Sequence, residues 1–364
     1  MNNEIMVSIL VITYNHEPYI KFTLDGILMQ KTCFQYEIIV HDDASTDKTA
    51  DIIREYEKKH PDMIKPIYQK ENQYSIDSER IIAAVMPYIN GKYIAYCEGD
   101  DFWIDENKLA IQVDFLESTP EYSACAHNEI MYNCMKGKVT GFHGYSATND
   151  VDVKATSENL VSLASLVYRA EYIFNRPDLF YFAHVPIYYW LCINGKVKFL
   201  ARVMSFYRHF SSHSAYNSRI REDYNFVIED RFRGVLFCEA AFQYLNDESE
   251  KENLERLISY TKRSLFYALH EKNHKRDSQK LSCAEDARFL ELCTEYDKFM
   301  KELSIIGKFE VLLRCKYKSL FDICVCLIKR QWRSKYMAMN QFRTLKSKGM
   351  IPKEWAEVKR VTNY

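Results

Sequence analysis

The sequence predicts an α/β protein with a mixed, mainly parallel sheet, followed by a helical carboxyl-terminal domain. Apolar strand-like segments alternate with helical segments over roughly the first 100 residues, which is typical of parallel strands joined by right-handed crossovers. From about residue 219 onward, apolar side chains recur at helical spacing. At 364 residues, the chain is long enough for one large or two small domains. We expect a domain at 1–215, with halves at 1–104 and 105–215, and a helical domain at 216–364.

The first expected strand, at 6–13, consists almost entirely of aliphatic and β-branched residues. Such a run is typical of a strand that is buried on both faces of a parallel sheet. Pro18 ends the polar loop that follows, and proline suits the first turn of a helix. Apolar residues at helical spacing predict that this helix ends near Gln30.

The second expected strand, at 36–40, runs into a polar loop with several acidic residues. Ser45 or Thr46 can cap the helix that follows this loop, because their side-chain oxygens accept hydrogen bonds from backbone N–H groups. A third strand is expected at 64–68 and a further helix at 81–88.

The fourth expected strand, at 93–97, ends in three carboxylates within four residues, Glu98, Asp100 and Asp101. Like charges this close repel one another, and a hard divalent cation such as Mg²⁺ or Mn²⁺ relieves that repulsion through oxygen ligands. Open α/β sheets place their ligands at the carboxyl ends of strands. The alternative is a solvated acidic turn ahead of a helix that begins near Glu106.

The same topology brings the ends of the first, second and fourth strands to one edge of the sheet. Tyr14 and Asn15 follow the first strand, and Asp42 and Asp43 follow the second. This combination suits a nucleotide whose phosphates arrive with a metal. An aspartate can accept a hydrogen bond from a base N–H, and Tyr14 offers a face for stacking. The alternative for the two aspartates is helix capping with favourable placement at a helix dipole.

The composition argues against several classes of protein. The net charge of −1 at pH 7 gives no reason to expect nucleic acid as a partner, and neither a G-x-G-x-x-G nor a P-loop motif occurs. Eleven scattered cysteines without C-x-x-C pairs favour reduced thiols over disulfides or zinc. No signal peptide is visible, and no apolar run reaches the roughly 18 to 20 residues of a transmembrane helix. We therefore expect a cytoplasmic protein.

Three ordered motifs, at 7–15, 42–47 and 91–101, resemble those of the family 2 glycosyltransferases. These are inverting enzymes of the GT-A fold that use nucleotide-sugar donors, and the resemblance covers roughly residues 5 to 215. It implies a transferase of the bacterial polysaccharide type. Such an enzyme moves a sugar from a nucleotide-diphosphate donor, expected to be a UDP-sugar, to a hydroxyl of a glycan or lipid-linked acceptor.

The resemblance also implies roles for individual residues. The acidic motif takes the place of D-x-D, with Glu98 toward the ribose, Asp100 on Mn²⁺ or Mg²⁺, and Asp101 beside it as a second metal ligand. Glutamate at the first position departs from the family pattern. Arg80 is the nearest match to the basic residue that meets the diphosphate. The residues implied for nucleotide-sugar binding are Thr13, Tyr14, Asn15, Glu17, Asp42, Asp43, Arg80, Glu98 and Asp100.

The expected catalytic base is a second departure from the family. Relatives carry Gly-Asp-x-Pro-Leu, whereas this chain reads Ala-His-Val-Pro-Ile at 183–187, so that His184 replaces the aspartate that deprotonates the acceptor hydroxyl. Imidazole is a chemically competent base near neutral pH, and Asp178 is the second candidate. Alternatively, His184 is a structural histidine in a partner subunit that binds nucleotide sugar without catalysing transfer. A nucleotidyltransferase is a weaker alternative, because the chain lacks a glycine-rich phosphate loop.

The acceptor half offers weaker candidates. A fifth strand is expected at 121–130, and a polar segment at 137–158 is long enough to form a lid over the site. A strand near 199–209 matches the one that closes the catalytic domain in similar enzymes, and a histidine there or His213 could reach the metal or diphosphate. A lone histidine is, equally, a buried or solvated residue without a site role. The candidates for contact with sugar or acceptor are His127, Asn128, Trp103, Arg208 and His209.

The segment at 305–348 carries eleven basic and two acidic side chains, interleaved with apolar ones. A basic amphipathic segment of this kind can lie on an anionic membrane surface, which would suit a lipid-linked acceptor on the inner face of the membrane. The alternative is a helical subdomain that packs on the catalytic domain and exposes a basic face to solvent.

Overall fold

A computed structural model describes residues 4–77, 79–134, 136–143, 147–153, 161–177, 184–209, 224–245, 248–275, 281, 283–284, 286–302 and 332–347. The chain divides into two compact units, one formed by 1–214 together with 334–364 and the other by 215–333. The expected domain boundary lies beside the start of the second unit. The end of the chain, however, belongs to the first unit.

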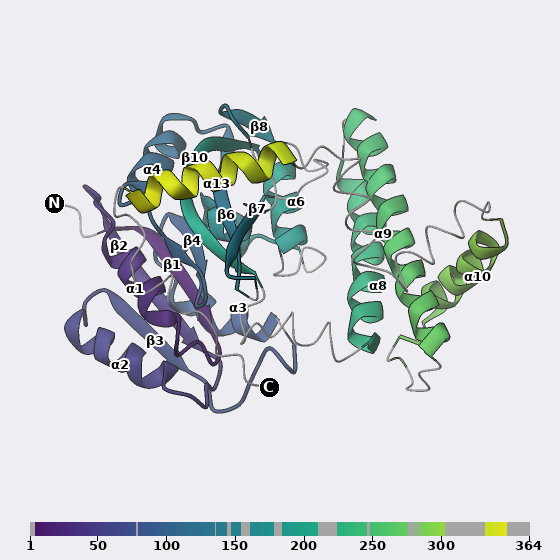
Figure 1. Cartoon of the computed structure of the whole chain (residues 1–364), viewed down its shortest axis with the longest axis horizontal. Helices are drawn as coiled ribbons and strands as arrows, with labels where there is room; N and C mark the ends of the chain where they lie inside the picture. The colour runs from purple at the N-terminus through teal and green to yellow at the C-terminus, as the bar shows by residue number, and fades with distance from the viewer. Residues whose placement is uncertain are drawn as a thin grey trace. The chain divides into compact units, whose positions relative to one another are not determined.

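The first unit contains, within the described residues, a ten-stranded sheet in the order β3-β2-β1-β4-β9-β6-β10-β5, with β7 beside β6 and β8 beside β10 (Figure 1). The strands are β1 (Ile5–Thr13), β2 (Gln35–Asp42), β3 (Ile64–Tyr68), β4 (Tyr93–Glu98), β5 (Phe102–Trp103), β6 (Tyr122–Asn133), β7 (Lys138–Phe142), β8 (Val151–Val153), β9 (Val167–Arg169) and β10 (Lys196–His209).

The long ladders of this sheet are parallel. β1 pairs in parallel with β2 and β4, β2 with β3, and β6 with β10. The short strands β5, β7, β8 and β9 pair antiparallel with their neighbours. The predicted mixed and mainly parallel sheet is therefore confirmed.

Helices cover the sheet and form the second unit. In the first unit they are α1 (Ile20–Leu28), α2 (Thr49–Lys59), α3 (Glu79–Val85), α4 (Lys108–Ser118), α5 (Glu171–Phe174), α6 (His184–Asn194) and α13 (Trp332–Ser347), with 3-10 turns η1 (Met86–Tyr88) and η2 (Leu163–Ser165). In the second unit they are α8 (Tyr224–Ala241), η3 (Phe242–Tyr244), α9 (Glu248–Lys275) and α10 (Ala287–Glu302). Among the described residues, no helix is both long and apolar enough to cross a membrane.

The core of the first unit forms where β1 meets the helices on one face of the sheet. Val7, Ile9 and Val11 alternate along β1 and are fully buried in a cluster that includes Leu24 of α1 and Ile53 of α2. Burying an aliphatic side chain of this size contributes about 1.5–3 kcal/mol. The apolar side chains whose spacing predicted the alternation of strands and helices therefore form the core that stabilises it.

The last described helix, α13, packs on the sheet of the first unit beside β6, β7 and β10 (Figure 1). Ala338 and Phe342 join the apolar cluster around Phe206, and the rings of Phe342 and Phe206 lie 5.7 Å apart. Arg343 and Lys346 on the same helix are exposed. This part of the basic segment is therefore a helix packed on the first unit with a solvated basic face.

The start of α2 differs from the prediction. Neither Ser45 nor Thr46 caps this helix, because it begins at Thr49 with Lys48 in the capping position and no side-chain cap. Asp47 instead accepts the Thr49 backbone N–H at 2.9 Å.

The predicted lid at 137–158 also needs correction. Its described residues include β7 and β8, which extend the sheet by pairing with β6 and β10. Residues 144–146 and 154–160 lie outside the described part of the chain. The predicted strand at 121–130 is β6, which continues to Asn133.

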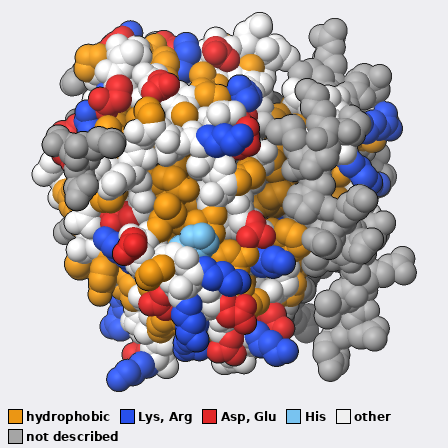
Figure 2. Space-filling view, turned by 90° about the vertical axis from the view of Figure 1, so that its left-hand side faces the viewer, with side chains coloured by type: hydrophobic (Ala, Val, Ile, Leu, Met, Phe, Trp, Pro, Cys, Tyr) orange, Lys and Arg blue, Asp and Glu red, His pale blue; other side chains and the backbone are white. Residues whose placement is uncertain are grey.

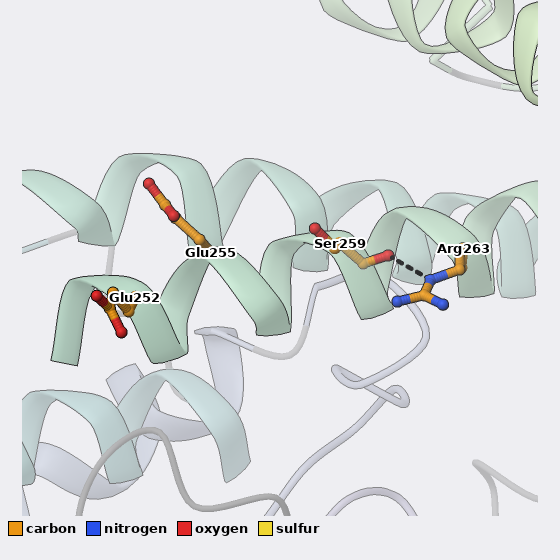
Figure 3. Close-up of a pocket in the computed structure, with 4 residues that line it drawn as sticks. All are labelled: Glu252, Glu255, Ser259 and Arg263. Carbon is orange, nitrogen blue, oxygen red and sulfur yellow. Dashed lines mark hydrogen bonds between the residues drawn. The ribbon is translucent and has the colours of Figure 1, made fainter. Parts of the chain in front are cut away.

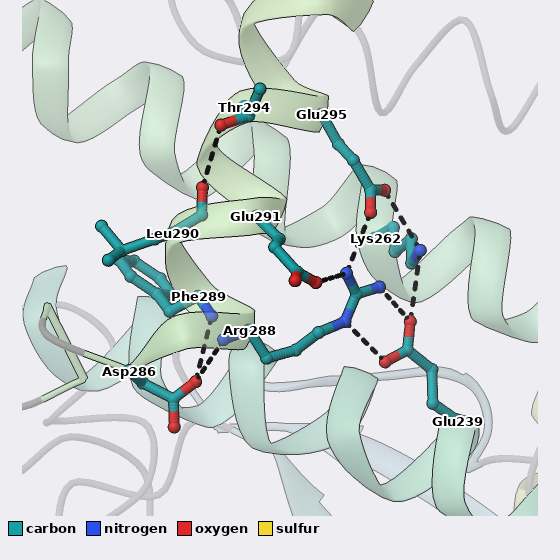
Figure 4. A network of polar contacts seen from close by, with 9 residues as sticks. All are labelled: Glu239, Lys262, Asp286, Arg288, Phe289, Leu290, Glu291, Thr294 and Glu295. Carbon is teal, nitrogen blue, oxygen red and sulfur yellow. Dashed lines mark hydrogen bonds and ion pairs between the residues drawn. The ribbon is translucent and has the colours of Figure 1, made fainter.

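The second unit is held by an apolar cluster and by a network of ion pairs (Figure 4). Arg288 of α10 binds both carboxylate oxygens of Glu239 on α8, at 2.6 and 3.0 Å. It also contacts Glu291 and Glu295, while Lys262 of α9 reaches Glu239 and Glu295. The network therefore joins the three α-helices that the structure describes in this unit.

The face of the molecule shown in Figure 2 is not strongly charged. The side shown in Figure 2 intersperses basic, acidic and apolar side chains, in keeping with a net charge near zero. A shallow depression in the second unit, of about 530 Å³, is lined by Glu252, Glu255, Ser259 and Arg263 of α9 (Figure 3). It contains none of the residues that the sequence analysis singled out.

Candidate active site

Three strand ends meet at one edge of the sheet, as predicted. Ile12 of β1 is the register partner of Glu98 on β4, and Thr13 is the partner of Asp42 on β2. The parallel register therefore brings the loops after β1, β2 and β4 together.

The acidic motif forms a compact group. Glu98, Asp100 and Asp101 each offer a carboxylate oxygen within 4.8 Å of the others. Glu98 is exposed, whereas Asp100 and Asp101 are 6% and 1% exposed. Although the residue as a whole is exposed, desolvation of its carboxyl group, followed by repulsion from Asp100 and Glu129, raises the pKa of Glu98 to about 8. Burial, followed by repulsion from Asp100, raises the pKa of Asp101.

Within the described part of the chain, one oxygen of this group has no hydrogen-bond partner. Asp101 accepts the backbone N–H of Arg208 at 2.8 Å through Oδ1. Its Oδ2 is buried without a hydrogen-bond partner, which is costly for a carboxylate oxygen. Hard oxygen donors that close together, one of them buried and unsatisfied, fit Mg²⁺ or Mn²⁺. Asp100 and Asp101 would hold the ion.

The turn that carries the acidic motif is built by close packing. A Cβ on Gly99 would lie 2.5 Å from Thr13 Oγ1 and 2.7 Å from His16 Nδ1, so no larger residue fits. The Thr23 hydroxyl of α1 lies 2.9 Å from the Gly99 carbonyl and 2.6 Å from the Asp101 carbonyl. The turn is thereby attached to both β1 and α1.

Arg208 supports the acidic turn from beneath. Its guanidinium donates to the Asp100 carbonyl and lies over the rings of Tyr19, Phe22 and Phe102, at 4.7 to 5.6 Å. The side chain is only 3% exposed. The sequence analysis suggested contact with sugar or acceptor, but the burial and contacts of Arg208 indicate that it supports the acidic turn.

The loops after β1 and β2 are joined by hydrogen bonds. Asn15, at φ 54°, donates its backbone N–H to Ser45 Oγ at 2.9 Å and accepts that of Thr46 at 2.7 Å. Glu17 donates its backbone N–H to Asp47 at 3.0 Å. Asn15 and Glu17 therefore shape the predicted nucleotide-binding edge.

The two aspartates after β2 differ in their contacts. Asp43 accepts the backbone N–H groups of Gln73 at 2.7 Å and Tyr74 at 3.0 Å, one on each carboxylate oxygen. Asp42 accepts a hydrogen bond from the Ser45 hydroxyl through Oδ1, and burial raises the pKa of Asp42. Asp43 thus anchors a neighbouring loop, which leaves Asp42 as the better candidate for the nucleotide base.

The remaining residues predicted for the nucleotide sugar lie around this edge. Thr13 is buried with Oγ1 at 3.1 Å from His16 Nδ1, and Tyr14 is partly buried. Arg80 is exposed, with Nη1 at 3.4 Å from Gln73 Oε1.

Three of the residues suggested for sugar or acceptor lie in the interior instead. His127, Asn128 and Trp103 are each 1% exposed. Burial lowers the pKa of His127 to about 3, and the Asn128 amide donates to two backbone carbonyls, at 2.8 Å each. The Trp103 ring packs under the Lys108 ammonium at 4.2 Å. These contacts give all three residues a role in packing.

The predicted catalytic base, His184, lies at the start of a helix. His184 is the first residue of α6, but its side chain lies outside the described residues, as do Asp178 and His213. His209 ends β10 and lies 6.2 Å from the ring of Tyr207. The roles of these residues stay predictions.

A buried carboxylate beside the acidic motif was not anticipated. Glu129 of β6 bonds to His143 Nδ1 at 2.8 Å and accepts the Ser205 hydroxyl at 2.7 Å. Burial would raise the pKa of Glu129, but these hydrogen bonds lower it to about 2. The His143 ring stacks on Tyr207 at 3.6 Å. A single glutamate in an apolar strand gives no sequence signal for such a cluster.

The family model described as glycosyl transferase family 2 matches residues 8–137, which include all three strand-end loops. The resemblance to the family 2 glycosyltransferases is therefore supported over this part of the chain. An uncharacterised protein of Mycobacterium tuberculosis is 35% identical over 222 residues, covering 58% of this chain and 62% of that protein. The match thus spans less than two thirds of the relative's length.

Other relatives match the amino-terminal part of this chain. TuaG of Bacillus subtilis, whose name assigns it to teichuronic acid biosynthesis, is 31% identical over 130 residues, covering 36% of this chain and 48% of TuaG. WfaP of Escherichia coli, a UDP-Glc:α-D-GlcNAc-diphosphoundecaprenol β-1,3-glucosyltransferase, is 33% identical over 113 residues, covering 31% of this chain and 42% of WfaP.

The solved structure of S. aureus TarS 1–349 with UDP-GlcNAc matches with a TM-score of 0.51 at 15% identity, covering 93% of this chain and 92% of TarS. The complex of the same TarS fragment with UDP matches with a TM-score of 0.50 at 13% identity, again covering 93% of this chain and 92% of TarS. At this identity the likeness concerns the fold, and the predicted GT-A fold is confirmed.

Proposed function

We propose that this protein is a family 2 glycosyltransferase that moves a sugar from a UDP-sugar to a hydroxyl of a glycan or lipid-linked acceptor, with inversion, in the synthesis of a bacterial cell-surface polysaccharide. The observation that carries the proposal is the acidic group at the end of β4, in which a buried oxygen of Asp101 lacks a partner. TuaG and WfaP support the polysaccharide context, and the names of WfaP and of the TarS complexes support uridine as the base.

The side chains along this edge of the sheet would each have a separate role in binding or catalysis. Asp42 would accept a hydrogen bond from the base, Tyr14 would stack on it, and Glu98 would face the ribose. A divalent ion on Asp100 and Asp101 would offset charge on the departing diphosphate. His184 would take the proton of the acceptor hydroxyl on the opposite side of the anomeric carbon.

A panel of nucleotide diphosphates tests the donor assignment. Thermal unfolding is followed with UDP, GDP, dTDP, ADP and CDP, each with and without Mn²⁺, because a ligand that binds only the folded state raises the Tm. We expect a rise with UDP that requires Mn²⁺. A rise with another diphosphate would correct the nucleotide, and no rise with any of them would overturn the proposal.

Turnover separates an enzyme from a non-catalytic partner subunit. Release of UDP from UDP-sugars, with and without polyprenyl-diphosphate-linked sugar as acceptor, is expected to depend on Mn²⁺ or Mg²⁺. Binding of donor without release of UDP under any of these conditions would identify a partner subunit.

Membrane contact through 305–348 belongs to the same proposal, because it would bring the enzyme to a lipid-linked acceptor. Residues 303–331 lie outside the described part of the chain. Co-sedimentation with vesicles that contain anionic lipid tests this contact, and equal binding to neutral vesicles would contradict it.

A further inference from the structure

The last described helix, α13, has one apolar face that packs on the sheet of the first unit. Ala338, Phe342 and Leu345 recur at i, i+4 and i+7, so they share that face. All three belong to the apolar cluster that includes Phe102 and Phe206 of the sheet. Ala338 is fully buried in this cluster. The helix is therefore held against the sheet through side chains that lie close to the end of β4.

Phe342 begins a series of aromatic contacts that crosses two strands. Its ring lies edge-on to that of Phe206 on β10, with 5.7 Å between the ring centres. Phe206 is the register partner of Phe102 on β5, and these two rings stack in parallel at 5.3 Å. Phe206 and Phe102 are 0% and 2% exposed. In a close-packed interior, the position of each ring restricts the position of the next.

This ring series of Phe342, Phe206 and Phe102 ends at the acidic turn. Phe102 directly follows Asp101 along the chain, so the position of its ring constrains the backbone that carries the Asp101 carboxylate. The ring of Phe102 also lies 5.2 Å from the Arg208 guanidinium. Arg208 in turn donates to the Asp100 carbonyl and, through its backbone N–H, to Asp101 Oδ1 at 2.8 Å. Contacts of known distance therefore lead from α13 to both aspartates.

We infer that Phe342 is a positioning residue of the metal site, which acts through Phe206 and Phe102 to hold the acidic turn in its binding geometry. The inference rests on the proposed function, which places a divalent ion on Asp100 and Asp101, and deepens it. Phe342 itself touches neither the ion nor the substrate. Groups behind the ligands of a metal fix their orientation and thereby tune the affinity. A helix from the last part of the chain thus takes part in a site that the first strands build.

Phe342→Leu removes the ring but keeps an apolar side chain in the cluster. Calorimetric titration of the full chain with Mn²⁺ in the presence of UDP measures the effect. We expect the Mn²⁺ affinity to fall about twofold to tenfold, as the loss of one aromatic contact implies. The loss is partial because the Thr23 hydroxyl also binds the carbonyls of Gly99 and Asp101. Wild-type affinity in Phe342→Leu would overturn the inference.

Two further variants separate positioning from stability. Phe342→Tyr keeps the ring at a partly buried position and should keep the wild-type Mn²⁺ affinity. Leu345→Ala loosens the same apolar face of α13 outside the ring series, so it should lower the Tm and leave the Mn²⁺ affinity unchanged. Equal weakening of Mn²⁺ binding in Leu345→Ala and Phe342→Leu would show that any loosening of α13 has this effect, and would refute the role of the ring.

Amide hydrogen exchange gives a readout that needs no metal. The backbone N–H groups of Gly99, Asp101 and Ile104 each donate a hydrogen bond at 2.9 Å, so exchange in the segment 98–104 reports local opening of the acidic turn. Without metal, we expect faster exchange in this segment for Phe342→Leu than for the wild type and Leu345→Ala. Identical exchange in all three proteins would contradict the inference.

The two readouts distinguish a failure of this inference from a failure of the proposed function. A wild type that binds neither Mn²⁺ nor UDP would overturn the proposed function, and exchange in 98–104 would still decide whether Phe342 holds the turn. A wild type that binds both, together with unchanged binding and unchanged exchange in Phe342→Leu, would overturn the role of Phe342 alone.

Discussion

Arg208 and Asp101 are joined by a hydrogen bond of 2.8 Å from the backbone N–H of β10 to one carboxylate oxygen at the end of β4. The Arg208 guanidinium donates in addition to the carbonyl of Asp100. A strand from residues 105–215 therefore fixes the orientation of the acidic turn, which lies in residues 1–104. The two parts of the chain meet here because the sheet is continuous.

Asp100→Ala should abolish metal-dependent turnover, because it removes a carboxylate that we assign to the ion. The Mn²⁺-dependent rise of the Tm with UDP should disappear as well. Glu106→Ala is the control, since Glu106 is an exposed carboxylate paired with Lys31. Undiminished turnover of Asp100→Ala would refute the metal assignment.

Arg208→Met should lower the Tm and weaken Mn²⁺ binding together. It removes a buried hydrogen bond and the cation–ring contacts, with an expected loss of about 2–4 kcal/mol in the free energy of unfolding. Metal titration of the folded variant at low temperature measures the second effect. Unaltered Mn²⁺ affinity in the folded variant would show that Arg208 serves stability alone.

His184→Ala should remove sugar transfer while donor binding persists, because the base acts on the acceptor hydroxyl. His184→Asp restores the carboxylate of the family pattern and should recover part of the turnover. The pH profile of kcat should shift to lower pH in His184→Asp, since an aspartate ionises below a histidine. Full activity of His184→Ala would transfer the role to Asp178 or another group.

Ala44→Gly should stabilise the fold by up to about 1 kcal/mol, because a Cβ is unfavourable in the left-handed region and glycine avoids that cost. Ala44 has φ 63° in the loop after β2. Thermal unfolding measures the gain. Ala50→Gly, inside α2, is the matched control and should destabilise by about 1 kcal/mol. A lower Tm for Ala44→Gly would mean that the entropy glycine adds to the unfolded chain outweighs the relief of backbone strain at φ 63°.

Glu129 predicts a pH dependence of stability. Its pKa is lowered to about 2 in the folded protein, compared with about 4.3 in an unfolded chain. The ionised carboxylate therefore stabilises the fold above about pH 4.3, and this contribution is lost as the pH falls toward 2. Glu129→Gln should lower the Tm near pH 6, and the difference from wild type should shrink toward pH 3. A constant difference across this range would contradict the assignment.

Much of the fold could be predicted because its cause is local. The aliphatic run of β1 and the spacing of the apolar residues in α1 indicate directly which side chains are buried. The parallel register of the strands then fixes where the loops after them meet. The loop residues were harder to assign. Both Asp42 and Asp43 follow β2, and only the contacts of Gln73 and Tyr74, 30 residues further on, separate their roles.

The sequence by itself determined the α/β class, the resemblance to the family 2 glycosyltransferases and the acidic motif at the carboxyl end of β4, because periodicity and motif spacing are properties of neighbouring residues. The tertiary structure decided which side chains face the site. Four residues that were predicted to contact sugar or acceptor are buried in the interior instead, namely Trp103, His127, Asn128 and Arg208. The tertiary structure also revealed the cluster around Glu129, whose partners His143 and Ser205 come from other segments. No local pattern encodes a contact that forms only when those segments pack together.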